Sequence, residues 1–249
     1  MKFSEVVGVY RSCGWRDFYG RAMRRLLDFA VPQISYAQSG EDQIVDYVFA
    51  SVGVCRPSYL EIGTNHPCEG NNTYKFYRKG CSGILVEADP SFAGVIPRKR
   101  PRDKFFNVGV AAGDASTLTF YAFEQTGHST FDEEEAEIRM KNGCVLKEKH
   151  MIPILSIAEV IERGGMGCPD FLSIDIEGLD LPVLKTLDFT KYPIPVICAE
   201  TCCFSADYRK DRNSDIAVFL DGKGYFLYAD TYINSIFVNT EWFERKRRG

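Results

Sequence analysis

Two stretches of sequence decide the fold: Ser58-Tyr-Leu-Glu-Ile-Gly-Thr-Asn-His66 and Gly83-Ile-Leu-Val-Glu-Ala-Asp89. Each begins as a short apolar run and stops at polar residues, which is typical of a strand buried on both faces. The separation of Glu61 and Glu87 along the chain matches one strand–helix–strand unit. We therefore expect two neighbouring parallel strands that each carry a glutamate near the carboxyl end.

The same alternation of strand and helix continues to the end of the chain. Further apolar runs lie at residues 105–110, 171–174 and 195–199, and the last two, 225–228 and 235–239, have no helix between them. Helical patterns lie at residues 72–79, 155–161, 181–187 and 214–221. The sequence therefore predicts an α/β fold, with a mostly parallel sheet closed by a C-terminal antiparallel hairpin and helices on both faces.

Three other segments carry local predictions. Residues 117–123 alternate in polarity, and we expect them to extend an edge of the sheet. Residues 132–150 are charged and predict a helix, which is either a lid over the site or a plain surface helix. Ser39 is expected to cap the helix that follows it, and Asp42 is expected to complete the capping turn.

The two ends of the chain are basic. Five arginines lie among apolar residues in the first thirty positions, and the chain closes with Arg245-Lys-Arg-Arg248. We expect a helical extension over residues 1–34 and a main domain over residues 35–249. The extension either packs on the domain or presents a basic face to a membrane surface or another anionic partner, such as a lipid-linked substrate. The net charge of −4 does not favour nucleic acid as a partner.

Cysteine usage bears on the compartment. The chain has nine cysteines, and none forms a CxxC pair, so neither a zinc site nor a secreted disulfide scaffold is expected. The start does not have the pattern of a signal peptide, and no apolar run approaches the roughly 18 residues of a membrane span. The sequence predicts a cytoplasmic protein with reduced thiols, whose basic ends are candidates for contact with the inner membrane face.

Carboxylates also follow the later strands. Asp175 and Glu177 come directly after the fourth predicted strand, and Glu200 ends the fifth. Because ligands of open parallel sheets bind beyond the carboxyl ends of the strands, these groups should surround one crevice. Gly63 lets the backbone approach a ligand closely, and Glu87 can accept both hydroxyls of a ribose. This arrangement predicts a site for an adenosine cofactor.

The loop after the first strand bears on the choice of cofactor. Gly63 is followed by His66-Pro67, and the next glycine is Gly70, so neither GxGxxG nor GxxxxGK[ST] is present. A pyrophosphate requires such a loop at a helix N-terminus. S-adenosylmethionine has no phosphate, and its ammonium and sulfonium charges suit Glu61. Two alternatives stay open: a nucleotide-sugar oxidoreductase that uses the same crevice, and a non-catalytic binding module on the same fold.

The ordered series of motifs resembles the FkbM-type methyltransferase family from about Ser35 to Asn239. The motifs are Tyr36-Ala-Gln-Ser-Gly-Glu-Asp42, Glu61-Ile-Gly-Thr-Asn-His-Pro67, Asn71-Asn-Thr73, Gly83-Ile-Leu-Val-Glu87, Asp170-Phe-Leu-Ser-Ile-Asp-Ile-Glu-Gly178 and Tyr232-Ile-Asn-Ser-Ile-Phe237. The resemblance implies a Rossmann-like class I methyltransferase fold and S-adenosylmethionine-dependent O-methylation. The expected acceptor is a hydroxyl of a sugar or glycan, followed by a lipid-linked sugar, a polyketide and a protein.

We expect each cofactor contact at a particular position. Gln38 and Glu41 would lie over the methionine end of the cofactor, Glu87 would take the ribose hydroxyls, and Ala88 and Val108 would flank the adenine. The full set of expected cofactor-binding residues is Gln38, Glu41, Glu61, Gly63, Thr64, Asn65, Glu87, Ala88, Val108 and Asp175.

The candidate catalytic residues are Asp175, Glu200 and His66. A divalent cation such as Mg²⁺, held by Asp175, Glu177 and Glu200, would lower the pKa of the acceptor hydroxyl. The competing hypothesis is a base without metal, either His66 or Asp175. His128 is the other histidine considered as a base.

Overall fold

The computed structural model describes residues 34–124, 129–201 and 214–248. The helical extension predicted over residues 1–34 therefore lies outside the described residues except for Ile34, and it stays a prediction. Residues 35–249 form one compact unit.

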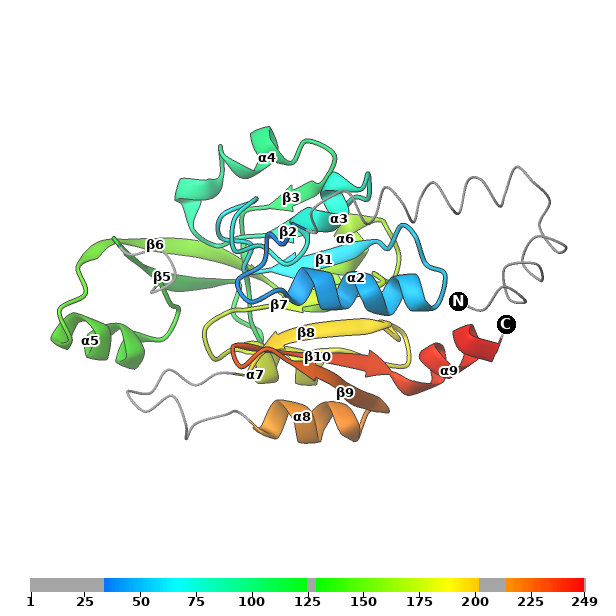
Figure 1. The fold of residues 1–249 in the computed structure, drawn as a ribbon. Coiled ribbons are helices and arrows are strands. Elements are labelled where there is room, and N and C mark those ends of the chain that lie inside the picture. Colours follow the sequence, from blue (N-terminus) through cyan, green and yellow to red (C-terminus); the bar gives the residue numbers. More distant parts are fainter. Residues whose placement is uncertain (1–33, 125–128, 202–213, 249) are drawn as a thin grey trace, which may run out of the picture. The chain divides into compact units, whose positions relative to one another are not determined.

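The main sheet has seven strands in the order β3-β2-β1-β7-β8-β10-β9 (Figure 1). The strands are β1 (Tyr59–Ile62), β2 (Gly83–Val86), β3 (Lys104–Phe106), β7 (Phe171–Ile174), β8 (Val196–Glu200), β9 (Tyr225–Asp230) and β10 (Asn234–Asn239). The first five in this order pair in parallel, and β10 pairs antiparallel with both β8 and β9. This arrangement confirms the predicted fold class, including the closing hairpin.

The central parallel strands end level with one another. Ile62 at the end of β1 lies opposite Val86 of β2 and Ile174 of β7. The residues that follow these strands therefore lie side by side at one edge of the sheet. This register brings together the polar residues that the sequence places after each strand.

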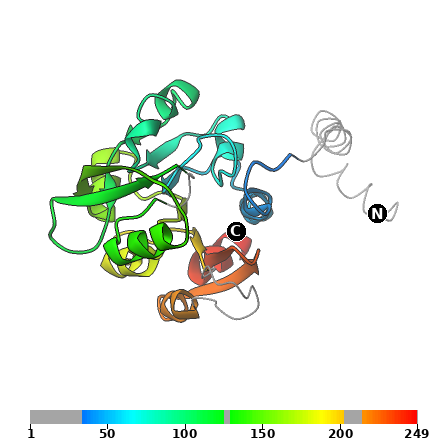
Figure 2. The same ribbon diagram turned by 90° about the vertical axis from the view of Figure 1, so that its left-hand side faces the viewer.

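Helices cover both faces of the main sheet. They are α2 (Glu41–Ser51), α3 (Tyr74–Arg78), η1 (Pro90–Phe92), α4 (Ile96–Lys99), α6 (Ile157–Gly164), α7 (Asp180–Thr186), α8 (Ser214–Asp221) and α9 (Thr240–Arg248). Helices α6, α7 and α8 pack on the face that includes Leu60 and Ile62. Helices α2, α3, α4 and α9 pack on the opposite face, which includes Tyr59. Figure 2 shows α2 beside α9, where the rings of Phe49 and Trp242 are 5.8 Å apart.

Strand alternation explains this division of the core, because Tyr59 and Glu61 point to one face of β1 while Leu60 and Ile62 point to the other. Glu61 is thereby placed on the α3 side of the sheet. Within the described part of the chain, no helix combines the length and the apolar character that a bilayer span requires.

A second, three-stranded sheet corrects three local predictions. Its strands are β4 (Gly109–Val110), β5 (Thr117–Phe123) and β6 (Leu146–Leu155), in the order β4-β6-β5. The run at 105–110 is split between the two sheets, and residues 117–123 pair with β6 and do not extend the main sheet. The predicted helix over 132–150 is α5 (Glu133–Lys141) only, because residues from Leu146 onward bond to β5. In Figure 1, β5 and β6 run out from the main sheet to α5; these three elements are called the arm below.

The predicted cap of the second helix is wrong. The residue before α2 is Gly40, which has a φ of 89°, and no side chain caps the helix. The backbone N–H of Ser39 donates to Oε2 of Glu41 at 2.8 Å. Glycine supplies the left-handed conformation that this entry to the helix requires.

Candidate active site

A cavity of ≈ 790 Å³ lies at the carboxyl ends of β1, β2, β7 and β8. This volume falls within the roughly 300–1,000 Å³ of small-molecule sites. The residues after the main strands form one wall. Phe120, Thr130 and Phe131, from β5 and the segment between β5 and α5, contribute another part of the lining.

The lining of the cavity is strongly acidic. Seven carboxyl side chains contribute to it: Glu61, Glu69, Glu87, Asp89, Asp175, Glu177 and Glu200. Among the described residues that line the cavity, none is a lysine or an arginine. Carboxylates crowded in this way repel one another unless cations or hydrogen-bond donors compensate. The cavity therefore suits a positively charged or donor-rich ligand better than a phosphate.

Glu87 is held in one orientation by the backbone. Its Oε2 accepts from the N–H of Asn65 at 2.7 Å, and its Oε1 accepts from the N–H of Asp89 at 2.8 Å. Burial raises the pKa of Glu87 to about 7, although these backbone bonds lower it. A carboxylate has about four lone-pair sites. Two are used here, so Glu87 can still accept from two ligand hydroxyls.

Glu61 is buried beneath the loop that follows β1. Its Oε2 accepts from Nδ2 of Asn71 at 2.7 Å and from Oγ1 of Thr73 at 3.0 Å. Burial raises the pKa of Glu61 to about 7, while the charge of Arg100 and these two hydrogen bonds lower it. No described residue bonds to Oε1 of Glu61, and this side chain lines the cavity.

Gly63 is required by the neighbouring strand end. Its φ is +82°, and a Cβ on it would lie 1.8 Å from the carbonyl oxygen of Asp175. Gly63 was expected to leave room for a ligand, but the backbone of Asp175 occupies that space. The N–H groups of Gly63 and Thr64 both donate to the carbonyl of Val86, which fixes the loop to β2.

Asp175 and Glu200 form a partly buried pair of carboxyl groups. A hydrogen bond joins their side chains across the ends of β7 and β8, and both line the cavity. Burial raises the pKa of both groups, and the charge of Asp175 raises that of Glu200 further. Two acids this close share a proton. The pair therefore holds one proton and one negative charge over a wide pH range.

Glu177 and Asp180 extend this acidic cluster. Glu177 has a φ of 54° and pairs with Arg139 of α5, with 3.0 Å between Oε2 and Nη2. Burial and then the charge of Asp175 raise the pKa of Glu177 to about 7. Asp180 is 2% exposed, and its Oδ1 has no hydrogen-bond partner. Burial, followed by the charge of Asp175, raises the pKa of Asp180 to about 7 as well.

The predicted Mg²⁺ site does not fit this arrangement. Asp175 and Glu200 bond to each other, and Glu177 bonds to Arg139, so the three proposed ligands do not converge on one point. In the described ranges, no group of three His, Cys, Asp or Glu side chains could hold a metal ion. The hypothesis of a carboxylate base without metal is the one that the side-chain geometry favours.

Two other predicted site residues need correction. Glu41 does not line the cavity, because its Oε1 accepts from Thr231 at 2.7 Å and from Asn234 at 3.1 Å. His66 does line it, but its Nδ1 accepts from the N–H of Glu69 at 3.0 Å. A neutral ring that accepts through Nδ1 carries its proton on Nε2, so this tautomer of His66 presents a donor.

The remaining expected cofactor residues surround the cavity. Those that line it are Gln38, Glu61, Gly63, Thr64, Asn65, Glu87, Ala88, Val108 and Asp175. His128 lies outside the described residues. Two parts of the lining were not predicted: Asn72, whose Nδ2 donates to Oγ of Ser173 at 3.0 Å, and the residues from the arm. Asn72 belongs to a quoted motif and could have been found; the arm residues carry no local signal.

Comparisons with known proteins bear on the family. A family model described as "Methyltransferase FkbM domain" matches residues 61–227, about two thirds of the chain. A comparison with curated proteins found no match.

Several solved structures resemble the fold. A TehB-like SAM-dependent methyltransferase from Corynebacterium glutamicum is 11% identical, with 90% of this chain and 100% of that chain covered and a TM-score of 0.41. The O-methyltransferase from Bacillus cereus in complex with SAH is 12% identical, with 94% and 95% covered and a TM-score of 0.39.

Proposed function

The chain belongs to the FkbM methyltransferase domain family, and from this premise we propose that it is an S-adenosylmethionine-dependent O-methyltransferase whose acceptor is a sugar or glycan hydroxyl. The observation that carries the proposal is the acidic cavity at the strand ends, which seven carboxyl groups line. S-adenosylmethionine brings an ammonium and a sulfonium charge, and a sugar brings several hydroxyl donors.

The residues present fit this cofactor. Glu87 faces the cavity with two free lone-pair sites, as the 2′- and 3′-hydroxyls of a ribose require. Ala88 and Val108 line the cavity, and Ala88 directly follows Glu87, so the pair suits the two faces of an adenine. Glu61 lies on the neighbouring strand end, where its free Oε1 suits the ammonium of the methionine part.

The same lining disfavours the nucleotide-sugar oxidoreductase. Both nicotinamide dinucleotides and nucleotide sugars carry a pyrophosphate, which needs backbone N–H groups at a helix N-terminus or cationic side chains. The described lining supplies neither lysine nor arginine. A non-catalytic binding module explains the cavity but gives no reason for the proton-sharing pair of Asp175 and Glu200.

We assign the pair of Asp175 and Glu200 as the general base. When bound, S-adenosylmethionine would supply an electrophilic methyl group to the acceptor oxygen and would leave as a neutral thioether. The hydroxyl proton passes to the singly protonated pair. Because burial raises the pKa of both groups, the pair is a stronger base near neutral pH than an exposed carboxylate.

The proposal of a sugar acceptor is supported by the mixture of groups at the cavity. Three aromatic side chains present their rings beside the carboxyl groups: Phe120 of β5, Phe131 of the segment between β5 and α5, and Tyr232 of the β9–β10 turn. Aromatic rings pack on the apolar face of a sugar, and carboxylates accept from its hydroxyls. Lipid-linked sugars, polyketides and proteins are the next acceptor classes, in falling order of preference.

Binding and transfer test the proposal separately. Calorimetry should show that wild type binds S-adenosylmethionine and that Glu87→Gln weakens binding about 10- to 100-fold, since a hydrogen bond to a charged group is worth ~1.5–3 kcal/mol. Glu69→Gln, at an exposed residue of the same lining, is the matched control and should change binding little. Tight binding of a nicotinamide dinucleotide without S-adenosylmethionine binding would reject the methyltransferase proposal.

The acceptor is tested in cells. Mass spectrometry of surface glycans from a strain that lacks the gene should reveal the loss of one methyl-for-hydrogen mass increment, which the wild-type gene restores. An unchanged glycan profile would contradict a glycan acceptor and favour a small molecule.

We also propose that the C-terminal helix contacts an anionic surface. Trp242 of α9 is buried against the α2 side of the domain, whereas Arg245, Lys246, Arg247 and Arg248 are exposed together. Flotation with vesicles that contain an anionic lipid should recover the protein, and reversal of these four charges should abolish recovery. Equal recovery of both proteins, or none of either, would contradict this contact.

A further inference from the structure

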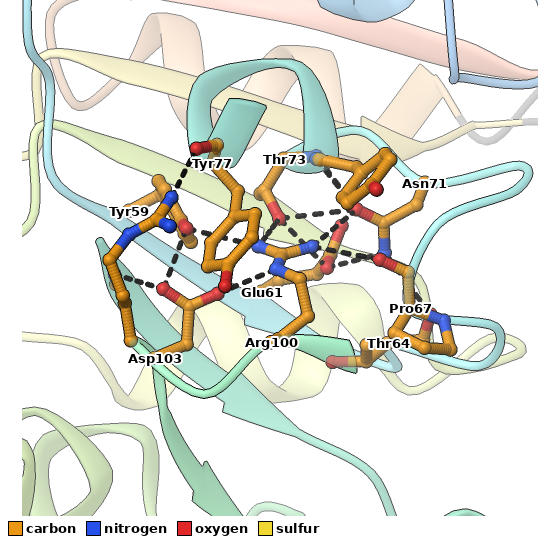
Figure 3. A network of polar contacts seen from close by, with 12 residues as sticks. Tyr59, Glu61, Thr64, Pro67, Asn71, Thr73, Tyr77, Arg100 and Asp103 are labelled. Atoms are coloured by element: carbon orange, nitrogen blue, oxygen red, sulfur yellow. Dashed lines mark hydrogen bonds and ion pairs between the residues drawn. The ribbon is translucent and has the colours of Figure 1, made fainter. Parts of the chain in front are cut away.

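Arg100 is a buried cation that lies outside the cavity. Its side chain is fully buried, and a guanidinium has five N–H donors. Each has an acceptor in the network of Figure 3. The acceptors are Oδ2 of Asp103 (2.7 Å), the carbonyl of Pro67 (3.0 Å), Oδ1 of Asn71 (3.2 Å), the hydroxyl of Tyr59 (3.0 Å) and Oγ1 of Thr73 (3.0 Å).

Aromatic rings hold the guanidinium in place. Its central carbon lies 4.7 Å from the ring centre of Tyr77 and 5.5 Å from those of Tyr59 and Tyr74. Asp103 balances the charge, and its Oδ1 also accepts from the hydroxyl of Tyr59 at 2.7 Å. With every donor used and rings around it, the position of Arg100 is fixed by the fold and not by a ligand.

Two residues connect this cation to the cavity. Asn71 accepts from Arg100 through Oδ1 and donates to Glu61 through Nδ2. Thr73 accepts from Arg100 through Oγ1 and donates from the same oxygen to Glu61. Since an N–H of Arg100 already points at each acceptor atom, Arg100 orients both donors toward Oε2 of Glu61.

We propose that Arg100 is a positioning residue for the cofactor site: through Asn71 and Thr73 it holds Glu61 as an anion whose second oxygen receives the ammonium group of the methionine part. This inference rests on the proposed function, since it assumes that the cavity binds S-adenosylmethionine. It assigns Arg100 a role that the sequence analysis did not suggest, because this residue is 39 positions from Glu61 along the chain.

The charge on Glu61 depends on this network. Burial raises the pKa of Glu61 to about 7, and the charge of Arg100 and the bonds from Asn71 and Thr73 act in the opposite direction. The other titratable groups that face Glu61 are Asp103, from the loop after α4, and Cys198 of β8. Loss of a bond from the network should therefore raise the pKa of Glu61 and leave less anion at neutral pH.

Two ligands separate this effect from general damage to the site. S-adenosylhomocysteine and 5′-methylthioadenosine share the adenosine and the thioether, but only the first carries the amino-acid group. In wild type, calorimetry should find that S-adenosylhomocysteine binds more tightly than 5′-methylthioadenosine at neutral pH, and that this preference is lost as the pH falls and Glu61 takes up a proton. A preference that does not change with pH would overturn the proposal, whatever the variants do.

Thr73→Val is the main variant. It removes one hydroxyl that touches both Glu61 and Arg100 and keeps the shape of the side chain. It should weaken the binding of S-adenosylhomocysteine about tenfold at neutral pH and leave the binding of 5′-methylthioadenosine unchanged. The pH at which the preference between the two ligands is half lost should shift upward. Arg100→Lys keeps the charge but loses the planar set of donors, so it should shift the preference in the same direction.

The matched control is Tyr225→Phe, because the hydroxyl of Tyr225 is also buried and donates to the carbonyl of Ile194 at 2.7 Å. Tyr225 does not line the cavity. This variant should leave the ligand preference unchanged. Equal weakening of both ligands by Thr73→Val, or an unchanged preference, would overturn the role of Arg100 while the proposed function stands. Failure of wild type to bind either ligand or S-adenosylmethionine would reject both.

Discussion

The guanidinium of Arg139 on α5 lies 3.0 Å from the carboxylate of Glu177, which follows the end of β7 at the cavity. Both side chains are mostly buried, with 14% and 22% of their surface exposed. The ion pair joins the arm to the acidic motif of the main sheet. The arm also contributes Phe120 to the cavity lining. The ion pair is therefore one of the contacts that hold the arm beside the cavity.

Loss of this ion pair should loosen the arm. We expect Arg139→Met to lower the free energy of unfolding by about 1–3 kcal/mol and to raise the pKa of Glu177, since the charge of Arg139 lowers it. KM for the acceptor should rise more than Kd for S-adenosylhomocysteine. Arg163→Met, which breaks an exposed pair with Glu159, should lower the free energy of unfolding much less. Unchanged hydrogen exchange over residues 133–141 in Arg139→Met would contradict this role.

The Asp175–Glu200 pair predicts how the rate depends on pH. Because burial raises the pKa of both groups, the pair gains protons readily, and the methyl-transfer rate should rise with pH as the pair changes from two protons to one. Asp175→Asn and Glu200→Gln should each lower kcat about 10²- to 10⁴-fold, the usual contribution of a general base. Single-turnover rates measured across pH check this. If Glu200→Gln keeps the wild-type rate and profile, the base lies elsewhere.

Asp180 predicts how stability depends on pH. Its pKa rises on folding from 3.8 to about 7, so the folded state binds the proton more tightly than the unfolded state. The tighter binding of this proton adds to the free energy of unfolding; the contribution is present in full below about pH 4 and is lost as pH rises through about 7. Asp180→Asn should therefore gain stability relative to wild type between about pH 5 and about pH 8, by more than ~1 kcal/mol in urea denaturation.

Asp188 offers a control of opposite sign. It is exposed, and hydrogen bonds from the N–H groups of Lys191 and Thr190 lower its pKa. Asp188→Asn should thus lose stability relative to wild type as pH rises through the acid range. A pH-independent difference between Asp180→Asn and wild type would show that Asp180 does not titrate in the folded state near neutral pH.

Alanine substitutions at two glycines of the same loop should lower the free energy of unfolding by different amounts. In Gly63→Ala, the new Cβ meets the carbonyl of Asp175 at 1.8 Å, so β1 and β7 must separate and the main sheet should lose several kcal/mol. In Gly70→Ala, nothing lies within 4 Å, and the cost should be only the ~1 kcal/mol of a positive φ. Thermal denaturation compares the two. Equal losses of stability in the two variants would mean that the backbone at Asp175 moves away from the new Cβ at little energetic cost.

The strands of the main sheet were predictable because they are local and deeply buried. The sequence predicted β2 and β7 to the residue, since each is a run of four apolar or small residues that polar residues end. It also predicted that Glu87, Asp175 and Glu200 would meet, because parallel strands place their carboxyl ends at one edge. Most of the expected cofactor-binding residues that line the cavity follow the strand ends and were predicted by the same rule, whereas Gln38 precedes the sheet.

The arm was not predictable because its pattern is decided by a distant partner. The sequence of residues 146–150 is charged and predicts a helix, yet this segment pairs with β5, whose residues lie 23 to 30 positions earlier. The run at 105–110 is mostly apolar, and the break between the strands at Asn107 and Val108 assigns its halves to different sheets. Hydrogen bonding between strands is a non-local interaction, so composition alone cannot choose the sheet.

The sequence by itself determined the fold class, the edge of the sheet that carries the site and most of the acidic residues around the cavity. Only the tertiary structure decided what each polar side chain does there. Glu41 bonds to Asn234 and leaves the cavity, His66 turns its acceptor nitrogen to the backbone, and Arg100 reaches Glu61 through Asn71. The role of a buried polar group depends on which partners satisfy it, and those partners are set by packing across the whole domain.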